Sequence, residues 1–579
     1  MATTLAQDED SLPLSEFIKL PTTIEFQVIY TDRFAAYAQE RPYIRLGTRL
    51  ANDYVVGYTN VNNIQQIFQD TGSDFLSFFP QLLSPTDSKT NDASGITPVL
   101  NQPFLNLSGR GVIIGIVDTG IDYTQPAFKF EDGTTKILNL WDQTIDGPRP
   151  DYLYYGAAYD KEQIDEALRS DDPYSIVPSR DEDGHGTFLA SVAASNETGD
   201  YIGAAPKAYL MIVKLRRANQ FFIDRYLVTP DNPNSYASTD YMLGMKYIFD
   251  RSEELNLPIV MCIGMGTNSG THDGTNLMED YISFGSQRAG YAVVTAAGNE
   301  SNTRHHTQGV IPLNYGKTQI SLRVAEQGAS FAVLIFTNGF DKVSAGVTSP
   351  SGEVIARVPF KSGLQTSHQL VLERSLIGIN YFRGSSNEII VTFENATQGI
   401  WDITLFGDSI IVGDYWAWLP ITGQVSPNVE FLKPVPEDTV VIPATAFRSI
   451  TCGAYNSDDN SLFVSSSWGP TRVPRMSPDF VAPGVNVNGI FPTGRGTMTG
   501  TSVAAAVTSG ATALLMEWAI VNGNIPAMDG DLVKSLLISG CVRENDIQYP
   551  NFKWGYGKLD LIRTFDVIKE SIINYGGIS

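Results

Sequence analysis

Cysteine is scarce in this sequence, and long hydrophobic runs are missing. The chain has 579 residues and only three cysteines, Cys262, Cys452 and Cys541, which form no Cys-x-x-Cys or Cys/His pattern. A disulfide framework and a structural zinc site are therefore excluded. No run of about 18 apolar residues occurs, and the acidic N-terminal segment lacks the basic and apolar regions of a secretory signal peptide. We expect buried cysteines, synthesis in the cytosol and no membrane partner.

Clusters of basic residues are also missing. The chain carries 40 Lys and Arg against 63 Asp and Glu, which gives a formal net charge of −23. Nucleic acid is excluded as a partner because no positive patch is available to hold phosphate groups. The composition, with 42% hydrophobic and 18% charged residues, is that of a globular protein. The length predicts about two to four domains.

The first part of the chain predicts a small α+β unit. Apolar residues alternate in TIEFQVIYT and YVVGYT, as in half-buried strands, and recur at helical spacing in VNNIQQIFQDTG. The stretch SPTDSKTNDASG, residues 84–95, follows this unit and has the polar composition of an exposed linker.

The remainder of the chain alternates between two patterns. From Gly111 onward, strand-like runs such as GVIIGIV and YAVVTAA alternate with helical segments such as STDYMLGMKYIFDRSEEL. This alternation predicts an α/β fold with a parallel sheet flanked by helices. From about Gly309 to Pro436, short β runs separated by turns predict an inserted antiparallel β domain, a sandwich or jelly roll. The expected segments are residues 1–90, 91–308, 309–436 and 437–579, of which the second and fourth form one α/β unit.

Four side chains near expected strand or helix ends could carry chemistry. Asp118 and Asn299 each follow an apolar strand, at the edge where α/β sheets bind ligands, while His185 and Ser502 each stand where a helical segment begins. Each has an ordinary structural reading as well, such as a turn for Asp118 or a helix cap for Ser502. The other histidines have no comparable setting: His272, His305, His306 and His368.

Together these four residues meet the separate requirements of acyl transfer. Ser502 can act as nucleophile, His185 as its base and Asp118 as the carboxylate that orients the imidazole. The Asn299 side chain and the Ser502 backbone N–H, at a helix start, can donate to an oxyanion. The chain order Asp, His, Ser is the order found in subtilisin.

Six motifs resemble those of the subtilisin-like serine proteases, in family order: IVDTGID, DGHGTFLAS, AAGN, SSSWGP, PDFVAPGV and GTSVAAA. The resemblance covers roughly residues 100–305 and 437–565. It implies a serine endopeptidase with Asp118, His185 and Ser502 as the triad and Asn299 in the oxyanion hole. Val503 and Ala506 depart from the Met and Pro that are usual in the family, but neither side chain transfers a proton.

The resemblance also implies a substrate channel. Gly264 and Gly266 would form one side of it, where their size lets backbone approach backbone. The primary pocket would be walled by Ala296, Ala297 and Gly298, which implies no particular cleavage preference. No cofactor is required. Calcium is common in the family but is left unassigned here, because the acidic clusters at 181–183 and 458–459 lack the EF-hand pattern and are expected to be solvated loops.

Three features resemble the Csp-type proteases of clostridial spores within this family: a long spacer between the Asp and His motifs, the inserted β domain and the missing signal peptide. That resemblance implies a zymogen whose N-terminal prodomain, up to about residue 90, assists folding, inhibits the enzyme and can remain bound after self-cleavage. The cleavage site would lie in the linker after Ser84. The implied location is the spore, and the implied protein substrate is the zymogen of a cortex-lytic hydrolase.

Three alternatives stay open from the sequence. The chain could be a pseudoprotease that acts as a binding or signalling protein. The N-terminal unit could be an accessory domain on an uncut linker. The β domain could carry the main function as a carbohydrate-binding module, with Trp401, Trp416 and Trp418 as its aromatic residues.

Overall fold

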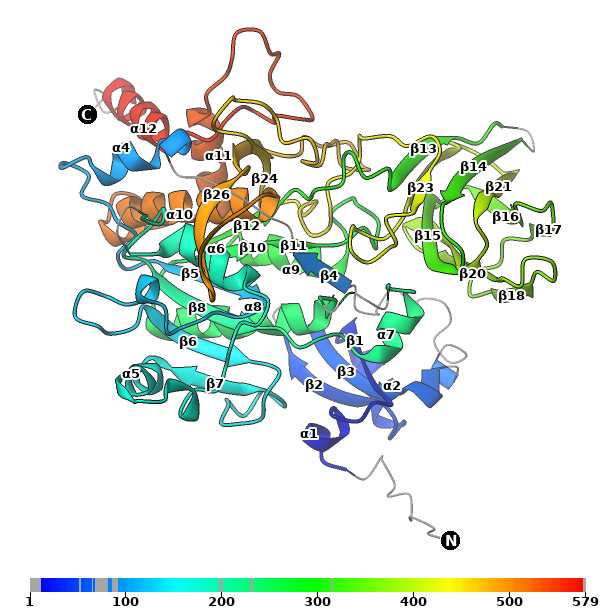
Figure 1. The fold of residues 1–579 in the computed structure, drawn as a ribbon, viewed down its shortest axis with the longest axis horizontal. Helices are drawn as coiled ribbons and strands as arrows, with labels where there is room; N and C mark the ends of the chain where they lie inside the picture. The colour runs from blue at the N-terminus through cyan, green and yellow to red at the C-terminus, as the bar shows by residue number, and fades with distance from the viewer. Residues whose placement is uncertain are drawn as a thin grey trace.

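The computed structural model describes residues 12–50, 54–64, 66–67, 82–85, 92–196, 201–229, 232, 234–313 and 316–575. Its centre is an eight-stranded sheet in which every neighbouring pair is parallel except β6 and β7 (Figure 1). The strand order is β25 (Phe480–Pro483), β24 (Ile450–Tyr455), β12 (Tyr291–Ala296), β10 (Ile259–Ile263), β5 (Ile113–Asp118), β8 (Tyr209–Lys214), β6 (Ile137–Asp142) and β7 (Ala157–Asp160). The predicted α/β fold is confirmed.

Helices cover both faces of this sheet, which explains why its strands read as continuous apolar runs. One face packs against α4 (Ile96–Leu100), α6 (His185–Ala194), α10 (Thr501–Met516), α11 (Gly530–Gly540) and α12 (Leu561–Tyr575). The other packs against α8 (Ser238–Leu255) and α9 (Leu277–Gly285). The segment Thr501–Val521 is long and apolar enough to cross a membrane, but 89% of its apolar 18-residue window is buried inside the protein, as expected for a core helix. All three cysteines are buried and free, as predicted.

The N-terminal unit is an antiparallel sheet with the order β1 (Thr23–Ile29), β3 (Tyr54–Asn60) and β2 (Arg45–Arg49). The alternation in TIEFQVIYT therefore predicted its first strand. Tyr58 and Val56 of β3 share a hydrophobic cluster with residues of α8 and α9. Ile24 and Phe26 of β1 belong to another cluster that includes Phe222 of α7 (Gln220–Arg225). The unit also contains α1 (Leu14–Phe17) and α2 (Asp32–Gln39).

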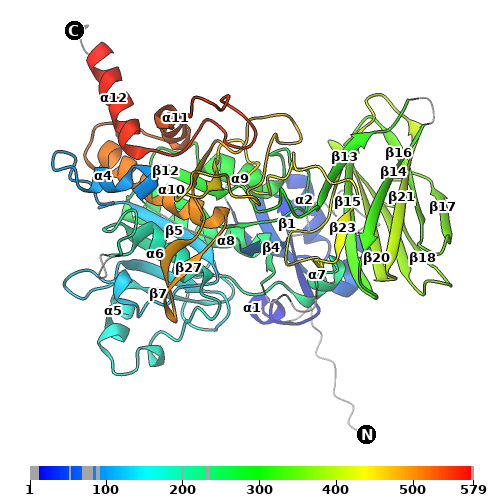
Figure 2. The same cartoon turned by 45° about the horizontal axis from the view of Figure 1, so that its top comes forward.

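The β domain is a sandwich of two antiparallel sheets, seen on the right of Figure 2. One sheet has the order β13 (His306–Val310), β22 (Asp414–Trp418), β15 (Ala329–Asn338), β20 (Ser386–Ala396), β19 (Leu376–Arg383) and β18 (Gln365–Gln369). The other has the order β17 (Val354–Val358), β16 (Lys342–Thr348), β21 (Gly399–Ser409), β14 (Lys317–Val324) and β23 (Val429–Phe431). Trp401 and Trp418 are fully buried, so neither offers an aromatic face to a sugar in solvent.

The segment expected to be an exposed linker enters a sheet instead. Strand β4 (Leu82–Pro85) lies between β9 (Tyr236–Ala237) and β11 (Met265–Gly266) and pairs antiparallel with both. Ser94, near the far end of the same stretch, is fully buried. The linker expectation is thus wrong at these positions, because the exposed edges of β9 and β11 offer backbone partners that a polar composition does not reveal. Residues 86–91 lie outside the described residues.

Candidate active site

Asp118 and His185 meet in the core of the α/β unit. Asp118 is the last residue of β5, and His185 is the first residue of α6. The His185 Nδ1 lies 2.7 Å from Asp118 Oδ1, and the two residues are 3% and 0% exposed. Because a carboxylate can only accept here, Nδ1 carries the hydrogen and Nε2 is left as an acceptor. The carboxylate therefore fixes both the tautomer and the orientation of the ring.

Ser502 completes the constellation from the opposite end of the chain. It is the second residue of α10, after an extended Gly500, and its Oγ lies 3.3 Å from His185 Nε2. The first turn of a helix has backbone N–H groups without intrahelical acceptors, and its dipole favours negative charge nearby. The structure thus brings the three residues singled out in the sequence into one hydrogen-bonded row.

Asp181 holds the helix that carries the histidine. Its carboxylate accepts hydrogen bonds from the backbone N–H groups of Gly184 and Thr187, at 2.8 and 2.9 Å, and also from the Thr187 hydroxyl. Neighbouring Glu182 pairs with Lys214 at 2.6 Å. Asp183 accepts from the Asn234 side-chain amide at 2.6 Å, so all three carboxylates of the acidic cluster at 181–183 are engaged by protein groups rather than simply solvated. The sequence prediction missed this role of Asp181 because its partners become neighbours only when the helix forms.

Asn299 lies beside the start of the serine helix. Its Oδ1 accepts from the Thr501 backbone N–H at 3.0 Å and from the Thr501 hydroxyl at 3.1 Å. The same hydroxyl accepts from the Gly298 N–H at 3.0 Å. Because the oxygen end of the amide is held in this way, its NH₂ end is the one that can donate to a substrate oxygen. Thr501 is a positioning residue that sequence reasoning did not identify, although it stands inside the GTS motif.

The model of the subtilase family matches residues 109–409 and 427–557 of the sequence. The chain belongs to the subtilase family. It is similar to the CspB protease of Clostridium perfringens, with 33% sequence identity and a TM-score of 0.73, over 83% of this chain and 97% of that chain. This membership confirms the resemblance inferred from the six motifs.

Curated relatives of this subtilase are longer proteins. The PII-type proteinase of Lacticaseibacillus paracasei is 22% identical over 549 residues, which are 84% of this chain but 27% of that protein. Fervidolysin of Fervidobacterium pennivorans is 25% identical over 300 residues, 51% of this chain and 35% of that protein. The chain thus spans between about a quarter and a third of the length of these relatives.

The predicted channel glycines of this subtilase leave no room for a side chain, because an added Cβ would lie 2.6 Å from Leu189 Cδ1 at Gly264 and 2.4 Å from a Val441 methyl at Gly266. A Cβ on Gly264 would lie 3.1 Å from the Ser502 Cβ and 3.3 Å from the His185 Cε1. Gly298 has a φ of +104°, which strains any residue with a side chain. Ala296 and Ala297 are 3% and 0% exposed, and their place in a primary pocket stays a prediction.

An open cleft of about 610 Å³ lies beside His185. Its walls include Asp183, Asn234 before β9, and Phe491 of the hairpin β26 (Val487–Phe491) and β27 (Gly494–Met498). Thr422, from the segment that leads out of the β domain, also lines it. His185 is the one member of the predicted triad among the residues that line this cleft.

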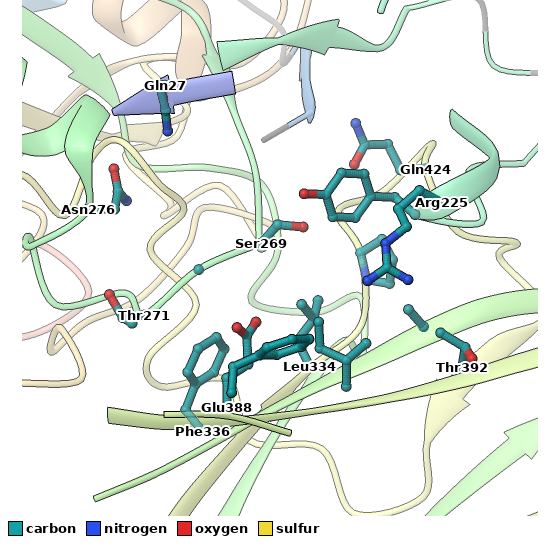
Figure 3. Close-up of a pocket in the computed structure, with 16 residues that line it drawn as sticks. Gln27, Arg225, Ser269, Thr271, Asn276, Leu334, Phe336, Glu388, Thr392 and Gln424 are labelled. Atoms are coloured by element: carbon teal, nitrogen blue, oxygen red, sulfur yellow. The ribbon is translucent and has the colours of Figure 1, made fainter. Parts of the chain in front are cut away.

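A second cavity, of about 170 Å³, lies where the N-terminal unit, α7 and the β domain meet (Figure 3). Glu388 of β20 and Arg225 of α7 line it together with apolar residues such as Leu334 and Phe336 of β15. Burial raises the pKa of Glu388 to about 7, against the opposing effect of Arg225. The lining includes none of the predicted catalytic residues, so this cavity is separate from the active site.

Proposed function

We propose that this subtilase is a serine endopeptidase in which Asp118, His185 and Ser502 form the catalytic triad. The observation that carries the proposal is the buried row of contacts, 2.7 Å from Asp118 to His185 and 3.3 Å from His185 to Ser502. Ser502 Oγ attacks a peptide carbonyl carbon while His185 Nε2 takes its proton. His185 then protonates the leaving amine, and water cleaves the acyl ester by the same proton transfers in reverse.

Negative charge develops on the carbonyl oxygen during both steps. We propose that the Asn299 NH₂, beside the start of α10, and the first-turn N–H of Ser502 donate hydrogen bonds to this oxygen. Because Asn299 is held by Thr501 before the substrate arrives, little reorganisation is needed in the transition state.

We further propose that the chain is made as a zymogen and cuts itself. Strand β4 lies in the channel as an extended segment, with Ser84 opposite Gly266 and Pro85 opposite Met265. The next residue of the channel wall is Gly264, which borders Ser502. We therefore expect self-cleavage in the stretch that follows Ser84 and Pro85. The N-terminal unit, packed on α8 and α9, then acts as a prodomain that fills the channel and inhibits the enzyme.

The decisive experiment compares wild type with Ser502→Ala by intact mass after identical expression. We expect wild type to give two fragments with a junction between residues 85 and 94, and the variant to stay whole. Cleavage of both chains alike would assign the cut to another protease. If both stay whole, peptide hydrolysis by wild type decides between an enzyme on an uncut linker and the pseudoprotease alternative.

The physiological substrate we propose is a spore cortex-lytic hydrolase made as a zymogen, cleaved during germination. The support is the similarity to the Clostridium perfringens CspB protease over 97% of that chain. Incubation of such a zymogen with the processed enzyme should release its N-terminal segment, and Ser502→Ala should not. Cleavage of casein without cleavage of the zymogen would refute this substrate and leave the endopeptidase intact.

A further inference from the structure

Residues 419–424, here called the strap, follow β22 of the sandwich and are bonded to both sides of the channel that holds β4. On the β11 side, the Asn268 side-chain amide donates to Leu419 O at 3.1 Å, two residues after that strand ends. The Thr422 N–H donates to Glu300 Oε1 at 3.0 Å. This side of the strap is thus held by residues that adjoin β11 and the predicted oxyanion donor.

The other end of the strap is bonded to the opposite side of the channel. Gly423 O accepts from Asn232 Nδ2 at 2.6 Å and from Thr229 Oγ1 at 3.1 Å. The Thr229 N–H donates to Gln424 O at 3.2 Å. The Gln424 side-chain amide lies 3.5 Å from Oγ of Ser235, the residue before β9. Because β4 pairs with both β9 and β11, the strap connects the two strands between which it lies.

The strap crosses on the solvent side of this channel. Thr422 and Gly423 are exposed, and both line the cleft of about 610 Å³ that contains His185. Pro420 and Gln424 line the separate cavity of about 170 Å³ (Figure 3). The strap therefore lies between these two spaces, and β4 passes between the strap and the α/β unit.

A segment bonded to both walls closes the acyl side of the channel to lateral entry. A polypeptide that binds as an added strand, in the place of β4, must then enter by its end. We propose that the strap is a specificity determinant of this subtilase, which restricts cleavage of other proteins to flexible segments with a free N-terminal tail before the scissile bond. The inference rests on the endopeptidase function proposed above.

Self-cleavage satisfies the same geometry in a different order. Strand β4 precedes the strap in the chain, so it can take its place before the β domain folds over it. The folded N-terminal unit then never has to pass beneath the strap. After the cut, the fragment has a free C-terminus and can leave the channel lengthwise.

The first test places a small folded protein on either side of a peptide with the sequence of residues 80–97. Processed wild type, at pH 8, should cut the free peptide and the fusion that carries the folded protein after the segment. Cleavage should be lost when the folded protein comes directly before the segment, because a folded domain cannot pass beneath the strap. Ser502→Ala gives the background, and mass spectrometry measures all three substrates.

A second substrate tests the closed channel without any folded domain. The same peptide, closed head to tail through a flexible Gly/Ser linker, has no end to thread, so wild type should leave it whole. Trypsin, which cuts after Lys89, is the control that the ring is accessible and should open ring and linear forms alike.

Loosening the strap should remove the restriction. The double variant Thr229→Ala/Asn232→Ala loses both side-chain bonds to Gly423 and should restore cleavage of the ring, since fewer bonds then hold the strap closed. Asn428→Ala is the matched control. It removes a surface hydrogen bond of the same kind, to Glu326 at 2.8 Å, and should leave the ring whole.

Two results would overturn the inference and leave the endopeptidase function standing. One is equal cleavage by wild type of the ring and the linear peptide, or of the two fusions. The other is a ring that trypsin opens but that stays whole in the double variant while its linear form is cut. Absence of any Ser502-dependent cleavage of the linear peptide would instead refute the endopeptidase function itself.

Discussion

At the scale of single residues, some residues of the site can be predicted from sequence motifs, whereas others are identified only in the folded structure. Asp118, His185, Ser502 and Asn299 each stand at the end of a strand or the start of a helix, so local patterns located all four. Val441 packs against Gly266 and Gly298, which are distant from it in sequence, and its own surroundings carry no motif. Asp181 and Thr501 are similar cases, because a hydrogen-bond partner cannot be predicted from composition.

Asn299→Ala tests the oxyanion donor. We expect kcat for peptide cleavage to fall by about 10²–10³-fold, the effect measured when this kind of donor is removed from a subtilisin. KM should change much less, because the interaction strengthens only as negative charge develops. Steady-state kinetics with one peptide, together with thermal unfolding to verify the fold, measure the effect. A rise in KM at constant kcat would instead assign Asn299 to substrate binding.

At the scale of elements, the longer strands and helices form where the apolar periodicity of the sequence predicted them, whereas the short strands were not predicted. The helix α8 spans the segment that its apolar spacing predicted. Strands β9 and β11 have only two residues each, too few for any periodicity, and β4 was hidden in a segment of linker composition. Pairing of such short strands is decided by which edges the larger fold leaves open.

Lys136, which immediately precedes β6, tests how the helix that carries His185 is held at its C-terminal end. Its Nζ donates to Ala194 O, at the end of α6, and to Pro206 O at 2.6 Å. Burial, together with the smaller effect of the Lys207 charge, lowers the pKa of Lys136 to about 7. Since the unfolded chain binds the extra proton between about pH 7 and the usual lysine pKa of 10.5, the free energy of unfolding should rise with pH in that window.

Urea unfolding at several pH values between 7 and 10 measures this contribution. Lys136→Met should remove a slope of up to about 1.4 kcal/mol per pH unit, while Lys317→Met, at an exposed lysine, should leave the slope unchanged. Equal slopes in wild type and Lys136→Met would show that the buried amine does not titrate in this range.

At the scale of the whole molecule, a buried charge cluster joins the N-terminal unit to the α/β unit. Arg216 Nε lies 2.8 Å from Asp240 Oδ2, and its Nη2 lies 3.8 Å from Glu25 Oε1 of β1. Burial raises the pKa of Glu25 to about 7, with Arg216 acting in the opposite direction. No sequence pattern predicted this cluster, because its members come from separate units of the fold.

After processing, this cluster should make retention of the N-terminal fragment depend on pH. In the bound state Glu25 keeps its proton up to about pH 7, whereas in the free fragment it has the usual pKa of 4.5. The affinity of the fragment for the enzyme is therefore greatest below pH 4.5 and falls as the pH rises to about 7. Gel filtration of the cleaved protein from pH 5 to 8 should show increasing dissociation. Glu25→Gln should remove this trend and Glu40→Gln, at an exposed residue, should keep it; the same trend in both variants would contradict the assignment.

The point at which the β domain joins the α/β unit has a mechanical consequence. The chain leaves for that domain after Asn299 and Glu300, and it returns immediately before Val441. Glu300 is bonded to His305 at 2.8 Å and to the Thr422 N–H at 3.0 Å, and Trp418 Nε1 donates to Asp438 O at 3.1 Å. A force that tilts the sandwich would therefore reach Asn299 first and, through its hydrogen bond with the Thr501 N–H, the first turn of the helix that carries Ser502. Bending of the β domain against the α/β unit should therefore change the position of Asn299 before that of Asp118 or His185.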